Sequence, residues 1–141
     1  MDRDPSVSGQ SLQQIIAKGD AQELVTQAEI LGRALGERNG NYNLTTNQIR
    51  AIFGTVRQVQ MSWDSSASAD RQLILLKPKL RYRAARDRSK GLNLLADVLS
   101  ESIDLVLEPK VDNPDEKKAR FGYFVDFFEA ILAYHKVAGG N

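Results

Sequence analysis

The side chains in this sequence that are best suited to chemistry are cations, and they are concentrated in one stretch. The 141 residues include 19 Lys and Arg and 18 Asp and Glu, which gives a net charge of +1. Eight of these cations and one acid, Asp87, lie between residues 71 and 90, so that window carries +7 and the remainder of the chain −6. Each Lys or Arg that neutralises a phosphate releases a condensed counterion, so this segregation of charge favours a polyanionic ligand.

The ordinary alternative is a surface helix with a solvated basic face. Two details argue for a phosphate ligand. Most of the cations are arginines, whose planar guanidinium can bind phosphate through two parallel hydrogen bonds. Tyr82 lies among them, and its ring is suited either to stacking on a base or to packing inward. From charge alone, both interpretations stay open.

The spacing of the cations is helical. Lys79, Arg83, Arg86 and Lys90 follow one another at intervals of four, three and four residues, so a helix would align them as one stripe. Arg81 and Arg88 point off that stripe. An alternative for the charge of Arg81 and Arg83 is a local network of ion pairs with the acidic flank of the next helix.

A second pair of arginines precedes this stretch. Arg50 and Arg57 are seven residues apart, so they stand two turns apart on one flank of a helix, with Gly54 between them. A glycine there leaves the backbone bare, which would let either a phosphate chain or, more commonly, a neighbouring helix come close.

The sequence contains few side chains that are suited to catalysis. The chain has one histidine, His135, and no cysteine, which excludes His-pair metal sites and thiolate chemistry. His135 falls on the apolar face of a helix, where a structural role is the expected one. A row of acids runs down one helix flank and resembles a solvated face more than a cation site: Asp97, Glu101, Asp104 and Glu108. Without a nucleophile or phosphate-loop motif, we expect no catalytic residues, no metal and no cofactor.

The elements that position these side chains are all predicted to be helices, packed as a single-domain bundle of five or six with no sheet. Residues 1–10 are predicted to be a flexible arm and residues 11–141 the helical domain. Asp20 with Glu23, and Thr45 with Gln48, have the spacing of capping boxes. The expected helices cover residues 11–16, 21–37, 45–63, 73–90, 92–107 and 115–137. We expect either a kink at Lys77 or a new helix with Pro78 in its first turn, and a break or bend at Gly91.

The last of these helices has more aromatic side chains than one buried face requires. Phe121, Phe124 and Phe128 share one broad face, whereas Phe127 and Tyr134 lie on the other side. Either the helix is buried all round, or its second aromatic side contacts another subunit. We therefore take Phe127 and Tyr134 as candidate interface residues.

The amino-acid composition indicates which broad class of protein this is. With 42% hydrophobic residues the chain can form a core. It contains no apolar run of the roughly 20 residues that a membrane span needs, and its N-terminus lacks the apolar segment of a secretory signal. These features predict a soluble cytoplasmic protein with no membrane partner.

Three stretches resemble motifs of the small subunit of the type III-A CRISPR effector, the Csm complex. Residues 44–57 contain LTTNQIR followed by Val56-Arg57, similar to an LTxxQIRxxxxxVR pattern. Residues 80–87 read LRYRAARD, similar to a central LxYxxAR segment. Residues 127–136 read FFEAILAYHK and are followed by Gly139-Gly140, which is similar to the most specific of the three motifs.

This resemblance implies a helical, non-catalytic subunit that stacks in several copies beside the backbone subunits, within a complex that also holds a large subunit. On this view the cations contact the guide–target RNA duplex through phosphates and riboses, while base pairing supplies specificity. The residues expected to bind RNA are Arg50, Arg57, Lys79, Arg83 and Arg86. The alternative is an assembly adaptor that docks through its aromatic last helix without touching RNA.

Overall fold

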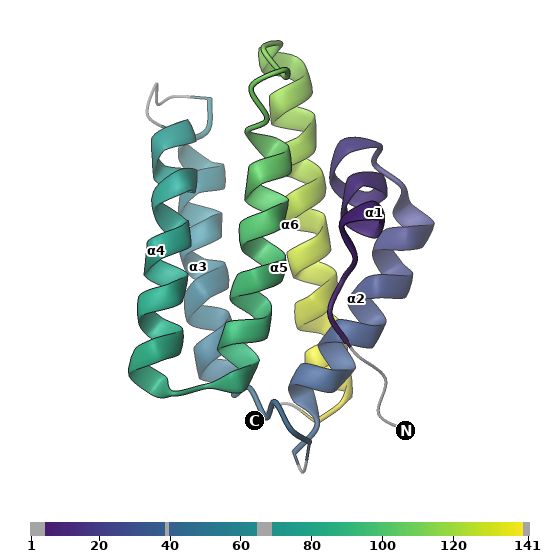
Figure 1. Cartoon of the computed structure of the whole chain (residues 1–141), viewed down its shortest axis with the longest axis vertical. Coiled ribbons are helices and arrows are strands. Elements are labelled where there is room, and N and C mark those ends of the chain that lie inside the picture. The colour runs from purple at the N-terminus through teal and green to yellow at the C-terminus, as the bar shows by residue number, and fades with distance from the viewer. Residues whose placement is uncertain (1–4, 39, 65–68, 140–141) are drawn as a thin grey trace.

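The computed structural model describes residues 5–38, 40–64 and 69–139, and all regular structure within these ranges is helical. Helices α3 to α6 alternate up and down, with α5 in front of α6 and the α3–α4 hairpin to one side (Figure 1). α2 and the short N-terminal turns cover the other side. The elements are α1 (Gly9–Leu12), the π-helical turn η1 (Gln13–Ala17), α2 (Ala21–Gly36), α3 (Thr46–Ser62), α4 (Ala69–Asp87), α5 (Lys90–Val106) and α6 (Pro114–Val137). The prediction of an all-α bundle is confirmed.

The helix starts follow from side-chain caps. Thr45 Oγ1 accepts from the Gln48 backbone N–H at 3.1 Å, and Gln48 Oε1 accepts from the Thr45 N–H at 3.0 Å, so the predicted capping box of α3 is present. Asp20 caps α2 by accepting from the Glu23 N–H at 3.0 Å. The Glu23 carboxylate instead accepts from Ser11 Oγ at 3.4 Å. Each cap stabilises its helix by about 1 kcal/mol.

No new helix begins at Pro78, because α4 runs without a break from Ala69 to Asp87. Proline removes one backbone donor and leaves the carbonyl of the residue four positions earlier, Ile74, without its helical partner. Both Pro78 and Ile74 are exposed, so water can satisfy that carbonyl. The proline is tolerated because it lies on the solvent side of the helix.

The turn after α4 is made by Arg88 and Ser89, and Arg88 comes three residues before the predicted break at Gly91. Arg88 has a positive φ of 50°, and the Ser89 N–H donates to the Ala84 carbonyl at 3.2 Å, as in a Schellman motif. Ser89 then caps α5. Gly91 lies inside α5, where a Cβ would come within 2.8 Å of the Tyr42 carbonyl oxygen.

The N-terminal residues that the structure describes are part of the domain. The predicted flexible arm covered residues 1–10, of which 1–4 lie outside the described ranges. Val7 is only 8% exposed and packs in the core, and Ser8 caps α1. In the structure, residues 5–10 thus contact the helical domain through Val7 and enter α1 through the Ser8 cap.

α2 crosses α6 at very short range. A Cβ added to Gly32 would lie 2.7 Å from the Ile131 carbonyl oxygen, and one added to Gly36 would collide with the His135 carbonyl oxygen. His135 itself is buried, and its Nε2 lies 2.6 Å from the Leu44 carbonyl oxygen. The histidine thus joins α6 to the segment before α3, which is a structural role as predicted.

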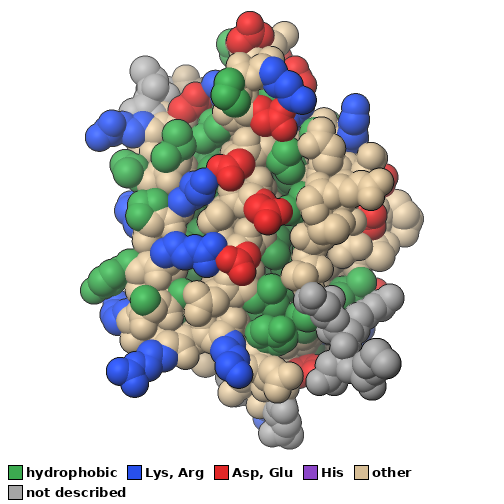
Figure 2. Space-filling view, viewed as in Figure 1, with side chains coloured by type: hydrophobic (Ala, Val, Ile, Leu, Met, Phe, Trp, Pro, Cys, Tyr) green, Lys and Arg blue, Asp and Glu red, His purple; other side chains and the backbone are tan. Residues whose placement is uncertain are grey.

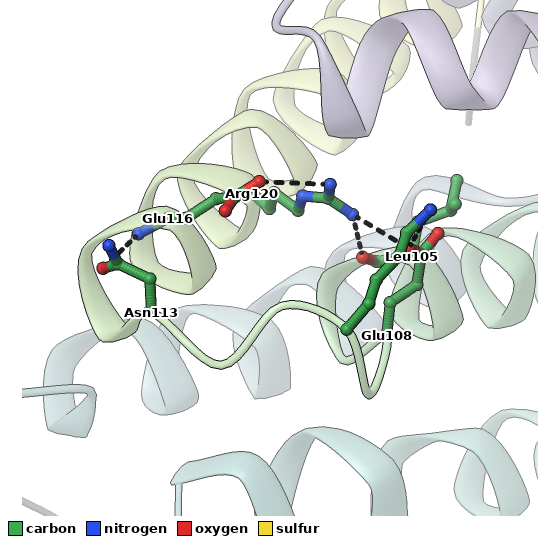
Figure 3. A network of polar contacts seen from close by, with 6 residues as sticks. Leu105, Glu108, Asn113, Glu116 and Arg120 are labelled. Carbon is green, nitrogen blue, oxygen red and sulfur yellow. Dashed lines mark hydrogen bonds and ion pairs between the residues drawn. The ribbon is translucent and has the colours of Figure 1, made fainter.

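The other end of α6 is joined to α5 by a buried arginine that no sequence pattern had indicated. Arg120 donates to the Leu105 carbonyl oxygen at 2.8 Å and to Glu116 at 3.3 Å (Figure 3). Its Nη1 also lies 3.7 Å from Glu108 Oε2. One guanidinium therefore hydrogen-bonds to a carbonyl near the end of α5 and to the Glu116 carboxylate, and forms a longer ion pair with Glu108, which joins α5 to α6.

Candidate nucleic-acid interface

The basic residues of α4 divide between two flanks. The α5-side flank consists of Lys77 and Arg81. Lys77 Nζ lies 2.6 Å from Asp104 Oδ1, and Arg81 Nη2 lies 2.5 Å from Asp97 Oδ1. Figure 2 shows blue side chains over α4 beside red ones over α5. The charge of this flank is matched within the chain, as the ion-pair alternative predicted for Arg81.

The α3-side flank consists of Lys79, Arg83 and Arg86. These three side chains line a groove of about 450 Å³ between α3 and α4. Within the described ranges, neither Lys79 nor Arg83 forms an ion pair. The ion-pair alternative is thus wrong for Arg83. Three of the five predicted RNA-binding cations are brought together here. Lys79 and Arg83 have no carboxylate within ion-pair distance in the described ranges, although the charge of Arg83 contributes to the lowered pKa of Asp87.

Arg86 is held in place at one nitrogen. Its Nε donates to Asp87 Oδ1 at 3.0 Å, while Gln48 Nε2 of α3 donates to Asp87 Oδ2 at 3.3 Å. The hydrogen bond from Arg86 lowers the pKa of the Asp87 carboxyl and in turn raises the pKa of Arg86. This pair uses Nε, so the two terminal nitrogens of Arg86 are left to meet a ligand.

Arg50 and Arg57 lie elsewhere, on the opposite flank of α3. Arg50 lines a separate hollow of about 210 Å³, whose other walls include Glu129 and Lys136 of α6. On α6, partial desolvation of the largely exposed Asp126 and the charge of the neighbouring Glu129 raise the pKa of Asp126. Arg50 is therefore surrounded by side chains of both signs of charge.

Arg57 donates from Nη1 to Gln60 Oε1 at 2.8 Å and is otherwise exposed. Around Gly54, between the two arginines, an added Cβ would meet no atom within 4 Å among the described residues, apart from the backbone of its own helix turn and its chain neighbours. A close helix contact at this glycine, the more common expectation, is therefore wrong for this chain. The bare backbone faces open space.

The aromatic residues proposed as an interface are covered by the chain itself. Phe127 is completely buried, so it offers no surface to a partner and that prediction is wrong for Phe127. It failed because the N-terminal turns and α2 cover the second side of α6. Tyr134 is half-buried, and the guanidinium carbon of Arg33 lies 5.9 Å from its ring centroid.

Several other features bear on chemistry. Among the described residues, no three His, Asp or Glu side chains are grouped so as to hold a metal ion. Asp97 and Asp104 of the acidic row are instead engaged by the cations of α4. None of the described helices has both the length and the apolarity to cross a membrane.

Comparison with known proteins identifies the family. Searches of the curated proteins and of the solved structures gave no match. A family model described as Csm2 Type III-A matches residues 18–141, which is most of the chain. The match confirms the resemblance seen in the three motifs. The chain belongs to the Csm2 Type III-A family, the small subunits of the type III-A CRISPR effector complex.

Proposed function

We propose that this chain is a non-catalytic subunit that stacks in several copies beside the backbone subunits of its complex and contacts the guide–target RNA duplex through the α3-side flank of α4. The contacts are to phosphates and riboses, so they are independent of sequence. The large subunit is a further partner in the same particle. Catalysis is left to other subunits.

One observation carries the proposal, namely the unequal neutralisation of α4. The α5-side cations face carboxylates at 2.5 and 2.6 Å, whereas Lys79 and Arg83 have no ion-pair partner within the described ranges. A protein with a net charge of +1 keeps local positive potential only where its cations escape pairing. Such a site attracts a phosphate chain without first breaking an internal pair.

The other two predicted cations are expected to contribute less. Arg50 shares its hollow with Glu129, and a carboxylate near a phosphate contact repels the ligand. Arg57 is exposed beside the open backbone at Gly54. We expect Arg57 to contact RNA where the strand passes over α3, and Arg50 to contact it weakly.

The test is the salt dependence of target RNA binding by the assembled complex. Replacing Lys79, Arg83 and Arg86 with Ala should reduce the slope of log K against log salt by roughly 0.7–0.9 for each phosphate that these side chains neutralise in each copy. The matched control replaces Lys77 and Arg81 with Ala on the α5-side flank. An unchanged slope in the first variant, or equal reductions in both, would rule the proposal out.

An assembly adaptor without RNA contact is the second candidate, and one observation favours it. Ile74 is 51% exposed and Leu75 is 42% exposed on the outer side of α4, where they could pack against a neighbouring subunit. In that case Ile74→Ser with Leu75→Ser should dissociate the particle, and Tyr134→Ala should weaken it. RNA binding by particles that remain intact would then be unchanged by the Lys79, Arg83 and Arg86 variant.

A further inference from the structure

The groove between α3 and α4 has an apolar floor that phosphate binding does not require. Ile52 of α3 and Leu76 and Leu80 of α4 line it, and each is at most 4% exposed. Thr55 and Pro78 complete the walls. The volume of about 450 Å³ lies within the range of about 300–1,000 Å³ that is usual for small-molecule sites. A site for phosphate alone needs only cations at the surface.

The rim of the groove has a second character. Lys79, Arg83 and Arg86 supply positive charge along its edge, and Tyr82 also lines it with 68% of its surface exposed. Tyrosine rings and guanidinium planes are among the side-chain groups on which unpaired bases stack. An apolar floor, a basic rim and an exposed aromatic ring thus occur within one groove.

We propose that this groove takes an unpaired nucleobase of the RNA strand, with the base over the apolar floor and its flanking phosphate held by Lys79, Arg83 and Arg86. A nucleotide joins a flat ring to an anion within a single residue, which matches this juxtaposition. An acidic peptide would need separate apolar and acidic side chains at matching spacing. The inference rests on the proposed RNA contact and adds that a base, as well as the backbone, is bound.

The position of Arg86 supports this orientation. Arg86 Nε donates a hydrogen bond to the Asp87 carboxylate, which also accepts one from Gln48 of α3. The guanidinium is thereby restrained at the edge of the groove before any ligand arrives. A cation that is already restrained loses less side-chain entropy when it binds.

The test compares two RNA strands that differ only in their bases. The full-length chain, with labelled methyl groups, is titrated with a short single-stranded oligouridylate and with an abasic strand of the same length and charge. We expect the oligouridylate to shift the methyl signals of Ile52, Leu76 and Leu80 and to bind roughly tenfold more tightly than the abasic strand. Methyls far from the groove, such as that of Ile15, should not move.

Two variants at Thr55 make the result specific to the groove. Thr55→Phe fills the groove without removing a cation, so oligouridylate should then bind no better than the abasic strand. Thr55→Val keeps the shape and should preserve the difference. Tyr82→Ala should reduce the preference for the strand with bases, and Tyr82→Phe should retain it.

Each other outcome has a distinct meaning. If both strands bind equally with the same salt slope and the groove methyls stay still, the base site is wrong and the phosphate contact stands. If neither strand binds, and the assembled complex also shows no effect of the Lys79, Arg83 and Arg86 variant, the proposed function itself fails. If an acidic peptide shifts these methyls and RNA does not, the groove is a protein-docking site and the inference is overturned.

Discussion

The two flanks of α4 come from one helix and use the same residue types, yet different surfaces face them. On one side, Lys77 and Arg81 meet the carboxylates of Asp104 and Asp97 on α5. On the other side, Lys79 and Arg83 border a groove against α3, whose groove-lining residues Ile52 and Thr55 carry no charge. The comparison teaches that a basic stretch in a sequence overstates the charge available to a ligand. What counts is the part of it that neighbouring helices leave unneutralised.

The energies involved explain why this division matters more for binding than for folding. Partly exposed pairs such as these stabilise a fold by only about 0–1 kcal/mol each. A cation that must leave such a pair nevertheless gains less from a phosphate than an unpaired one does. The α5-side flank therefore locates α4 against α5, and the α3-side flank is left for the ligand.

The largest expected effect comes from reversing one charge on the α3-side flank. Arg83→Glu should reduce the affinity of the assembled complex for target RNA roughly tenfold per contact, because it removes a charge-assisted contact and adds a repulsion. Fluorescence anisotropy with labelled target RNA measures this reduction. Arg81→Gln is the control, and an equal reduction there would erase the distinction between the flanks.

A smaller effect is expected from releasing the neutralised flank. Asp97→Asn together with Asp104→Asn frees Arg81 and Lys77, so RNA affinity should rise roughly threefold and the salt slope should steepen by at most about 0.9 for each freed cation. Adding Lys77→Gln and Arg81→Gln to the same variant should abolish the gain. No change on releasing the acids would show that these cations lie out of reach of RNA.

Removing the negative charge beside Arg86 should act in the same direction but less. Asp87→Asn removes the charge that neighbours Arg86 and Arg83 and keeps an amide oxygen that can still accept from Arg86 Nε, so the restraint on the guanidinium is retained and RNA affinity should rise roughly twofold. The pKa of Asp87 is lowered by its hydrogen bond from Arg86, so its contribution to stability is present above the ordinary carboxyl pKa of about 3.9. That contribution is lost as the pH falls through the lower pKa of the folded state. Denaturation of the unmodified chain and of the Asp87→Asn variant at several pH values between 7 and 2 should therefore show that their unfolding free energies converge in acid.

The smallest effect on RNA is expected at a cation that lies beyond both flanks. Arg88 follows the last residue of α4 and has a φ of 50°, a conformation that costs a residue with a Cβ about 1 kcal/mol. Arg88→Gly should raise the unfolding free energy by up to that amount, measured by thermal denaturation. In complexes that contain this variant, the slope of log K for target RNA against log salt should match that of the unmodified chain. A reduced slope would show that Arg88 also contacts RNA.

The features that followed from sequence are those decided within a few residues. The capping box of Thr45 and Gln48 and the stripe of Lys79, Arg83 and Arg86 depend on local spacing along one helix, and both were predicted. The structural role of His135 followed from its place on an apolar face. Family membership followed from three short motifs.

What sequence missed was decided by packing between distant segments. Phe127 was predicted to be an interface residue because the sequence does not show that α2 and the N-terminal turns pack over its side of α6. Pro78 is tolerated because its side of α4 faces solvent, which the local pattern does not reveal. The split between Arg83 and Arg81 depends on which neighbour lies against each flank. The burial of Arg120 and its contacts to α5 were not predicted, because a single arginine adds nothing to the pattern of hydrophobic residues along a helix.

The most direct measurement of the central claim leaves every charge intact. A photo-crosslinking amino acid is placed in the assembled complex at Thr55, which lines the α3–α4 groove, or at Asn93, which is exposed on α5, and the particle is loaded with labelled target RNA. We predict crosslinks to RNA from position 55 and none above background from position 93. Crosslinks from position 93 alone, or from neither position in a particle that still binds RNA, would contradict the claim that RNA lies along the α3-side flank.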